Sequence, residues 1–194
     1  WSASFSGAKA VPGSYKVRLA VNGKEQKQDF TILPDPRSES SVTDMQKQFD
    51  FVNEVNQTVD KAHKAIKNMR EIRSKLKDFV KQNQSDSTAT KLVAQAKTIQ
   101  EDLLEVEKTL YQTQNRSNQD PLNFPIRLTN KLGHLNRLLT IDDFPPTNQD
   151  LAVKEELTAA VEVAMERYQQ LIDSDVASFN EVFKKEKRNY LGTD

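Results

Sequence analysis

The chain has 194 residues, with 28 Lys and Arg balanced by 28 Asp and Glu, and it contains no cysteine. The zero net charge removes the broad basic excess that nucleic-acid binding needs, and the lack of cysteine excludes disulfides, thiolate metal sites and thiol nucleophiles. No stretch approaches the roughly 20 apolar residues that cross a bilayer, so we expect no membrane span. The first residue is Trp1 rather than Met, so we expect a piece of a longer protein.

The first predicted element is a β-hairpin. Apolar and polar residues alternate from Tyr15 to Asn22, and Asn22-Gly23 is the pair that best accepts a type I′ turn. The return strand should run from Lys24 to about Leu33. The expected cross-strand pairs are Val21 with Lys24, Leu19 with Gln26, Val17 with Gln28, and Tyr15 with Phe30. One face then carries Tyr15, Val17, Leu19, Phe30 and Ile32. Because two strands alone are marginal in water, this face needs a partner surface.

A long helix is predicted next, over residues 43–82, with Thr43 as its N-cap. Its apolar residues recur in steps of three or four: Met45, Phe49, Val52, Val55, Val59, Ala62, Ile66, Met69, Ile72, Leu76 and Phe79. At 1.5 Å per residue this helix should be roughly 60 Å long.

Shorter helices should follow. The second, over residues 89–114, carries Leu92, Ala96, Ile99, Leu103, Val106 and Leu110, and the third, from about Pro125, carries Leu128, Leu132, Leu135 and Leu139. Thr147 with Asp150 resembles a capping box for the fourth. Its stripe is Val153, Leu157, Ala160, Ala164, Tyr168 and Leu171. A break at Asp173-Ser174-Asp175 should precede a short fifth helix, with Val176, Phe179 and Phe183 facing inward.

These stripes predict a mainly α fold, an antiparallel up-and-down bundle of four long helices and a short fifth. The second and fourth helices are too short to cover the first, so its N-terminal third should be covered by the fifth helix or by the hairpin. A basic run on the first helix faces acidic residues on two others. The basic residues are Lys61, Lys64, Lys67, Arg70, Arg73, Lys75, Lys77 and Lys81, and the acidic ones are Glu101, Asp102, Glu105, Glu107, Glu155, Glu156, Glu162 and Glu166. We interpret these charges as a solvated face that sets helix register, with a surface for an acidic partner as the alternative.

Candidate chemistry is sparse. His63 lies three residues after Asp60, but a di-metal bundle needs two Glu-x-x-His pairs and further carboxylates, and His134 has no such neighbour. Asp142 and Asp143 are adjacent, a poor arrangement for two carboxyls that must flank a substrate, so helix termination is the better interpretation. No Gly-x-Ser-x-Gly turn or glycine-rich phosphate loop is present. We therefore assign no catalytic, cofactor-binding or metal-ligating residue, expect no cofactor, and do not expect an enzyme.

The hairpin region also carries a resemblance to a known family. The run from Pro12-Gly13-Ser14-Tyr15 through Val21-Asn22-Gly23-Lys24 to Asp35-Pro36-Arg37 resembles the "PGxYxVxLxVxGKxxxxxxxVxxDPR" segment of a bacterial family. These are large exported proteins with sortilin-like, BNR-repeat β-propellers, often labelled glycosyl hydrolases. The segment from Asp44 to Phe49 and the one from Leu128 to Leu132 resemble parts of the helical region that follows. The resemblance implies that residues 1–36 end an immunoglobulin-like β-sandwich and that residues 37–194 are a helical C-terminal region.

The resemblance also shapes the functional expectation. Any hydrolase or carbohydrate site would lie in the propeller, which this chain does not include, so no functional residue carries over. We expect a non-catalytic C-terminal structural or interaction module of an exported multidomain protein, located in the periplasm, at the outer membrane or outside the cell. Its partner would be the propeller of the same protein, another protein, a polysaccharide or a second copy. The alternative is an independent coiled-coil-like adaptor or oligomerisation domain.

Overall fold

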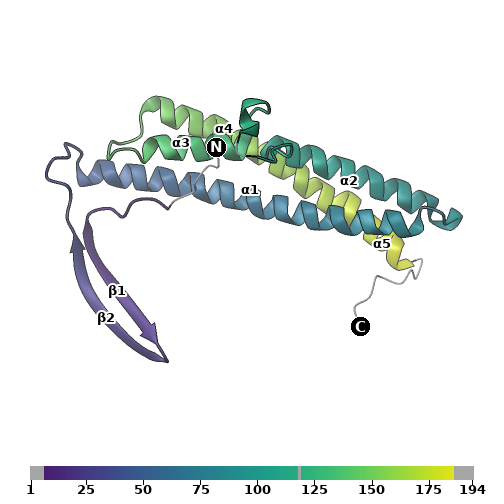
Figure 1. The fold of residues 1–194 in the computed structure, drawn as a ribbon, viewed down its shortest axis with the longest axis horizontal. Coiled ribbons are helices and arrows are strands. Elements are labelled where there is room, and N and C mark those ends of the chain that lie inside the picture. Colours follow the sequence, from purple (N-terminus) through teal and green to yellow (C-terminus); the bar gives the residue numbers. More distant parts are fainter. Residues whose placement is uncertain (1–6, 118, 186–194) are drawn as a thin grey trace.

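The computed structural model describes residues 7–117 and 119–185, in which a helical bundle is preceded by a two-stranded hairpin (Figure 1). The bundle has three rows of helices. The first row is α1 (Val42–Asn83) alone, the second is α2 (Thr90–Leu110) followed by α3 (Leu128–Leu139), and the third is α4 (Asn148–Leu171) followed by α5 (Ala177–Lys185) (Figure 1). The predicted helical fold is confirmed. In this bundle α3 continues the row of α2 instead of lying beside it (Figure 1).

The first row is α1, Val42–Asn83. Its N-cap is Ser41 rather than the predicted Thr43: the Ser41 Oγ accepts a hydrogen bond from the Asp44 N–H at 3.1 Å, and the Asp44 carboxylate accepts one from the Ser41 N–H at 3.4 Å. This reciprocal capping box satisfies two backbone donors at once. The buried stripe holds Phe51, whereas the predicted Phe49 is half-buried. Because α1 contacts helices of both other rows, its buried face is broader than one stripe.

The second row comprises α2, Thr90–Leu110, and α3, Leu128–Leu139, with the short 3-10 turns η1 (Ser87–Ala89) and η2 (Asp120–Leu122) before and between them. The predicted stripe of α2 is buried throughout. The helix ends four residues earlier than predicted because Tyr111 has an extended backbone, with φ −138° and ψ 145°. The Thr129 hydroxyl donates to the Leu110 carbonyl at 3.0 Å, so the start of α3 satisfies an acceptor that the end of α2 leaves open.

The third row begins with α4, Asn148–Leu171, and the predicted capping box of Thr147 and Asp150 is confirmed. The predicted break before a separate fifth helix is wrong. A π-helical turn, η3 (Ile172–Val176), joins α4 directly to α5, Ala177–Lys185. The Ser174 hydroxyl donates to the Gln170 carbonyl at 2.7 Å within this turn. The π turn includes the polar residues Asp173, Ser174 and Asp175 without ending the helix. Phe179, in the helix that follows, is buried.

The N-terminal part of α1 is covered by α3 and the start of α4, not by the fifth helix or the hairpin as predicted (Figure 1). A buried amide closes this end: the Gln48 Nε2 lies 2.7 to 2.9 Å from the carbonyl oxygens of Leu139, Asp142 and Phe144. At the opposite end of α1, α5 packs through Phe79 and Phe179, whose ring centroids are 5.4 Å apart. The other two rows therefore pack against α1 from its N-terminal end to its C-terminal end.

The hairpin is formed by β1, Gly13–Val21, and β2, Lys24–Ile32, which pair antiparallel in the predicted register. Asn22 and Gly23 both have positive φ, 50° and 78°, as a type I′ turn requires. The hairpin points away from the bundle (Figure 1). The segment just before it returns to the bundle, where Ala8 packs on the core and Lys9 pairs with Asp143. Among the described residues the sheet has two strands, so it forms no sandwich by itself.

Candidate functional site

The two histidines of the chain lie apart and in different surroundings. His63 is half-buried on α1, where its ring meets the ring of Tyr111 edge to face at 6.2 Å, whereas His134 is exposed on α3. Burial lowers the pKa of His63 below its ordinary value, with a further lowering from Arg70 and an opposing effect of Asp60. The Asp60 carboxylate pairs with Lys64 at 2.6 Å. The Asp60 carboxylate thus has a lysine partner, and its charge also acts on His63.

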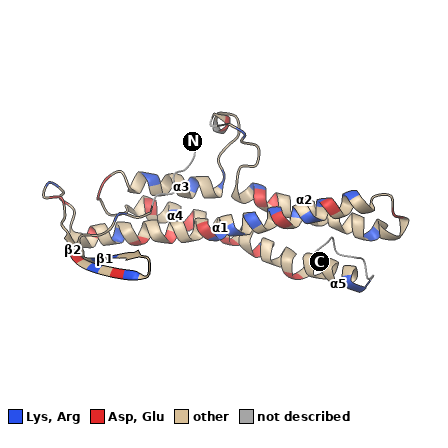
Figure 2. Cartoon of the chain, turned by 60° about the horizontal axis from the view of Figure 1, so that its bottom comes forward, with Lys and Arg blue, Asp and Glu red and all other residues tan. Residues whose placement is uncertain are grey.

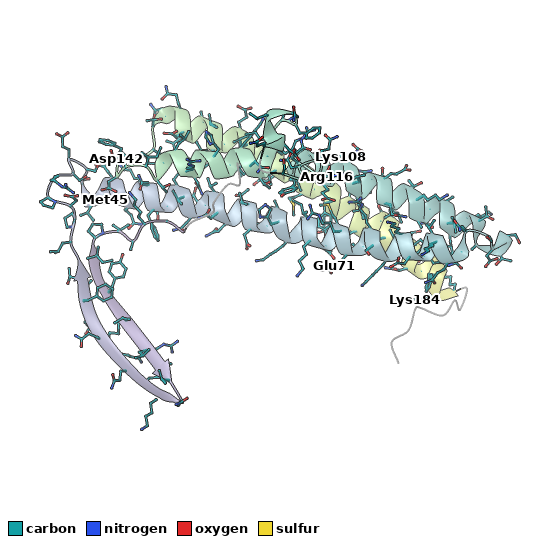
Figure 3. All side chains as sticks on the ribbon, in the orientation of Figure 1. Met45, Glu71, Lys108, Arg116, Asp142 and Lys184 are labelled. Carbon is teal, nitrogen blue, oxygen red and sulfur yellow. The ribbon has the colours of Figure 1, made fainter. Side chains whose placement is uncertain are left out.

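The adjacent carboxylates of Asp142 and Asp143 lie in the turn after α3, close to Met45 at the start of α1 (Figure 3). The Asp142 side chain accepts a hydrogen bond from the Asp143 N–H at 2.8 Å, and Asp143 pairs with Lys9 at 3.1 Å. Both carboxyl groups therefore tie down the loop and the segment before the hairpin. Within residues 7–117 and 119–185, no three His, Asp or Glu side chains gather so that they could hold a metal ion.

The apolar face of the hairpin carries several apolar side chains that are exposed together. Tyr15 is 36% exposed, Val17 is 53% exposed and Leu19 is 61% exposed. Phe30 stacks on Tyr15 at 5.8 Å between centroids, and the Tyr15 hydroxyl donates to the Val11 carbonyl at 2.6 Å. The side chains of this strand pair therefore have fixed partners within the hairpin, while their outer surface remains in contact with water.

The opposite face of the hairpin is charged. Lys16 pairs with Asp29 at 3.3 Å, and Arg18 pairs with Glu25 at 3.1 Å. In Figure 2 basic and acidic residues lie close together along the ribbon of this element. The hairpin is thus amphipathic, with one face suited to water and the other suited to burial.

A second site lies between α1 and the end of α2. The Glu107 side chain is only 3% exposed, and its two oxygens accept hydrogen bonds from Arg70 Nε at 2.7 Å and from Arg73 Nη1 at 2.5 Å. The guanidinium of Arg70 also lies over the ring of Tyr111, 5.4 Å from its centroid. Sequence reasoning placed Glu107 on a solvated face, which is wrong. Its spacing of four from Leu103 and three from Leu110 puts it at the edge of the buried stripe, and that signal could have identified it.

Beside this ion-paired cluster is a cleft of about 480 Å³. Its walls are Ile66 and Tyr111 with the polar residues His63, Lys67, Arg70, Glu71 and Ser74. Tyr111 is half-buried, and Figure 3 places Glu71 on the outer side of α1. The cleft therefore combines an apolar floor with a rim in which positive groups predominate, an arrangement that suits an anionic group attached to an apolar body.

Comparisons with known proteins add no relative: no protein family, no curated protein and no solved structure matches the chain. None of the helices in the described ranges combines the length and the apolar character that crossing a bilayer requires.

Proposed function

We propose that this chain is a non-catalytic structural and interaction module, in which the helical bundle holds the β-hairpin for insertion into a neighbouring β-structure. The observation that carries the proposal is the exposed apolar face of the hairpin. Its side chains occur at the spacing and in the register of a half-buried sheet, yet Leu19 is 61% exposed. Hairpins of two strands gain independent stability only when a further layer covers the apolar face.

The bundle supports this role because its core is closed without the hairpin. The three rows bury Phe51, Leu103 and Leu132 almost completely, and β1 and β2 contribute nothing to that core. The hairpin is attached through Lys9 on one side and through residues 33–41 on the other. The bundle can therefore stay folded by itself and hold the hairpin, while the unburied apolar face of the hairpin is available for docking.

The sequence resemblance gives this proposal a biological setting. In the family that the hairpin region resembles, the neighbouring β-structure is the immunoglobulin-like sandwich next to a sortilin-like, BNR-repeat propeller. The chain would then be the C-terminal module of an exported protein, in the periplasm, at the outer membrane or outside the cell. The missing layer would be supplied by strands of that sandwich, and the bundle would lie against the propeller.

Site-specific photo-crosslinking in the producing cell tests the proposal. A photo-reactive amino acid in place of Leu19 should crosslink to peptides from a β-strand region, of the same polypeptide or of a partner. The same amino acid in place of Arg18, on the charged face, is the matched control and should give far less product. Equal crosslinking from both faces, or crosslinks only to helical segments, would contradict insertion into a β-structure.

The isolated chain offers a second, independent measurement. Val17→Lys should change the free energy of unfolding by less than about 0.5 kcal/mol, because the side chain is already exposed. In the presence of the covering β-structure the same change should prevent docking, since it would bury an unpaired ammonium group. Urea unfolding of the isolated Val17→Lys variant measures its stability. The crosslinking yield from position 19 in the same variant measures docking on the β-structure.

A further inference from the structure

We infer that the chain associates with further copies of itself, with the outer face of α4 in one copy packing against the groove between α1 and α2 in another. This interface is separate from the hairpin and goes beyond the function proposed above. It rests on two surfaces that have the same length, the same spacing and opposite charge.

The first surface is a polar stripe on α1. Steps of four and three residues lead from His63 to Lys67, Arg70, Ser74, Lys77 and Lys81. His63 is half-buried, and the other five residues are exposed. Such steps place the residues on one face, along about 27 Å of helix. The 480 Å³ cleft lies along the first half of this stripe, with Ile66 and Tyr111 as its apolar floor.

The α2 side of the groove has matching apolar positions. Leu104 on α2 is half-buried, and so is Tyr111, which directly follows the last residue of that helix. Of these two residues, Tyr111 lines the cleft. Between them Glu107 is buried and fixes Arg70 and Arg73 on the neighbouring helix. Arg70 is thereby held at its Nε while its side chain remains 52% exposed. The groove thus has a preformed positive group that does not need to be ordered when a partner binds.

The second surface is the outer face of α4. The same steps of four and three connect Ala152, Glu156, Ala159, Val163, Glu166 and Gln170, and all six are exposed. Val163, near the middle of this stripe, is 67% exposed. Small and apolar residues in the centre of a helix face, with glutamates around them, form the pattern of a helix that lies in a groove.

The charges of the two surfaces match in position. Lys67 and Lys77 are ten residues apart, and so are Glu156 and Glu166, a separation of about 15 Å along each helix. Both lysines can therefore face both glutamates at once. These four side chains form no ion pair with any other residue in the described part of the chain.

Charge also selects the pairing. Contact between two copies of the groove would place lysines against lysines, and contact between two α4 faces would place glutamates against glutamates. Only the contact of unlike surfaces brings opposite charges together, and the zero net charge of the chain adds no overall repulsion. An interface of unlike surfaces leaves a free groove on one end copy and a free α4 face on the other, so the assembly grows with protein concentration.

Sedimentation analysis of the full chain tests this inference. The average mass should rise with concentration at about 0.02 M salt and fall back toward the monomer at about 0.5 M salt, because the exposed charges are then screened. The measurement is repeated with Val17→Lys and Leu19→Lys present, so that association through the hairpin does not contribute. A chain that sediments as a monomer at every concentration and salt level would overturn the inference.

Charge reversal then assigns the two surfaces. Lys67→Glu with Lys77→Glu should weaken association at least about tenfold, and so should Glu156→Lys with Glu166→Lys, since each variant sets like charges against each other. A mixture of these two variants should associate again, because each supplies the surface that the other now lacks. A mixture that remains monomeric would overturn the inference.

The matched control is Lys61→Glu with Lys75→Glu, which makes the same change of charge on exposed positions of α1 outside the stripe. It should leave association unchanged within about twofold. Equal weakening by this control would mean that general charge, and not the groove, controls association. Circular dichroism of each variant should give the helical signal of the unmodified chain.

A synthetic helix with glutamates at the spacing of Glu156 and Glu166 provides a last test. If this helix binds while the chain itself stays strictly monomeric, the partner is a different protein and the inference is overturned.

Discussion

The bundle and the hairpin follow their sequence patterns equally well, but only the bundle buries its apolar residues. In the bundle, Leu103 and Leu110 are fully buried because two other rows of helices cover them. In the hairpin, Leu19 has the correct register and the correct face, yet no second layer lies over it. Periodicity thus predicts which side of an element is apolar. Burial, and the stability that comes with it, depends on whether a complementary surface is present.

The largest expected effect is in the core of the bundle. Leu103→Asp should unfold the chain, because it would place an unpaired carboxylate among apolar side chains at a cost of several kcal/mol. Glu105→Ala is the matched control on the same helix, and its side chain is 69% exposed. It should change stability by less than about 0.5 kcal/mol. Thermal melting by circular dichroism measures both, and equal melting temperatures would contradict the assignment of the buried stripe.

A smaller effect is expected at the buried ion pair. Glu107→Ala should reduce the free energy of unfolding by about 1–3 kcal/mol, because Arg70 and Arg73 would lose their shared acceptor. Water can still reach Arg70, whose side chain is 52% exposed, so the loss should stay below that of a fully buried pair. Urea unfolding measures the change. A loss no larger than that of Glu105→Ala would mean that Glu107 does not fix the contact of α1 with α2.

Removal of the hairpin should have a modest effect on the bundle. A chain that begins at Ser38 should keep its helical signal at 25 °C, because the three rows close the core without β1 and β2. It should melt somewhat earlier, since the contacts of Ala8 and of Lys9 with Asp143 are lost. Thermal melting compares the two chains. Loss of most of the helical signal would mean that the hairpin segment belongs to the core.

The smallest expected effect is a pH dependence from His63. Burial lowers the pKa of this side chain below its ordinary 6.5, so the unfolded chain binds its proton more readily than the folded chain. Stability from the neutral ring is therefore fully present above pH 6.5 and is lost as pH falls through the lower pKa of the folded state. His63→Gln should reduce the slope of stability against pH below 6.5. Urea unfolding at several pH values measures it, with His134→Gln on an exposed site as the control.

Several features of the fold could be predicted from local residues alone. The Asn22-Gly23 turn and the register of the hairpin follow from the φ angles that these two residues accept and from the two-residue period. The stripe of α2 and the capping box at Thr147 follow from helical spacing and from hydrogen bonds within one turn. In each case the residues that decide the structure are neighbours in the chain.

Other features depended on residues far apart in the sequence. Gln48 is a polar residue in an apolar stripe, and its burial is explained only by carbonyls more than 90 positions away. Glu107 is buried because Arg70 and Arg73 lie opposite it on another helix. Asp173 and Asp175 looked like a helix end, but packing of Phe179 against Phe79 keeps the helix continuous through a π turn.

By itself the sequence determined the hairpin with its turn, the helical segments and the capping box of α4, because periodicity, capping and turn geometry act within a few residues. Only the tertiary structure decided how the elements share their surfaces. It set α3 behind α2 in one row, so that two other rows bury α1, and it left the apolar face of β1 uncovered. The physical reason is that burial is a property of two surfaces together, and a sequence pattern describes only one of them.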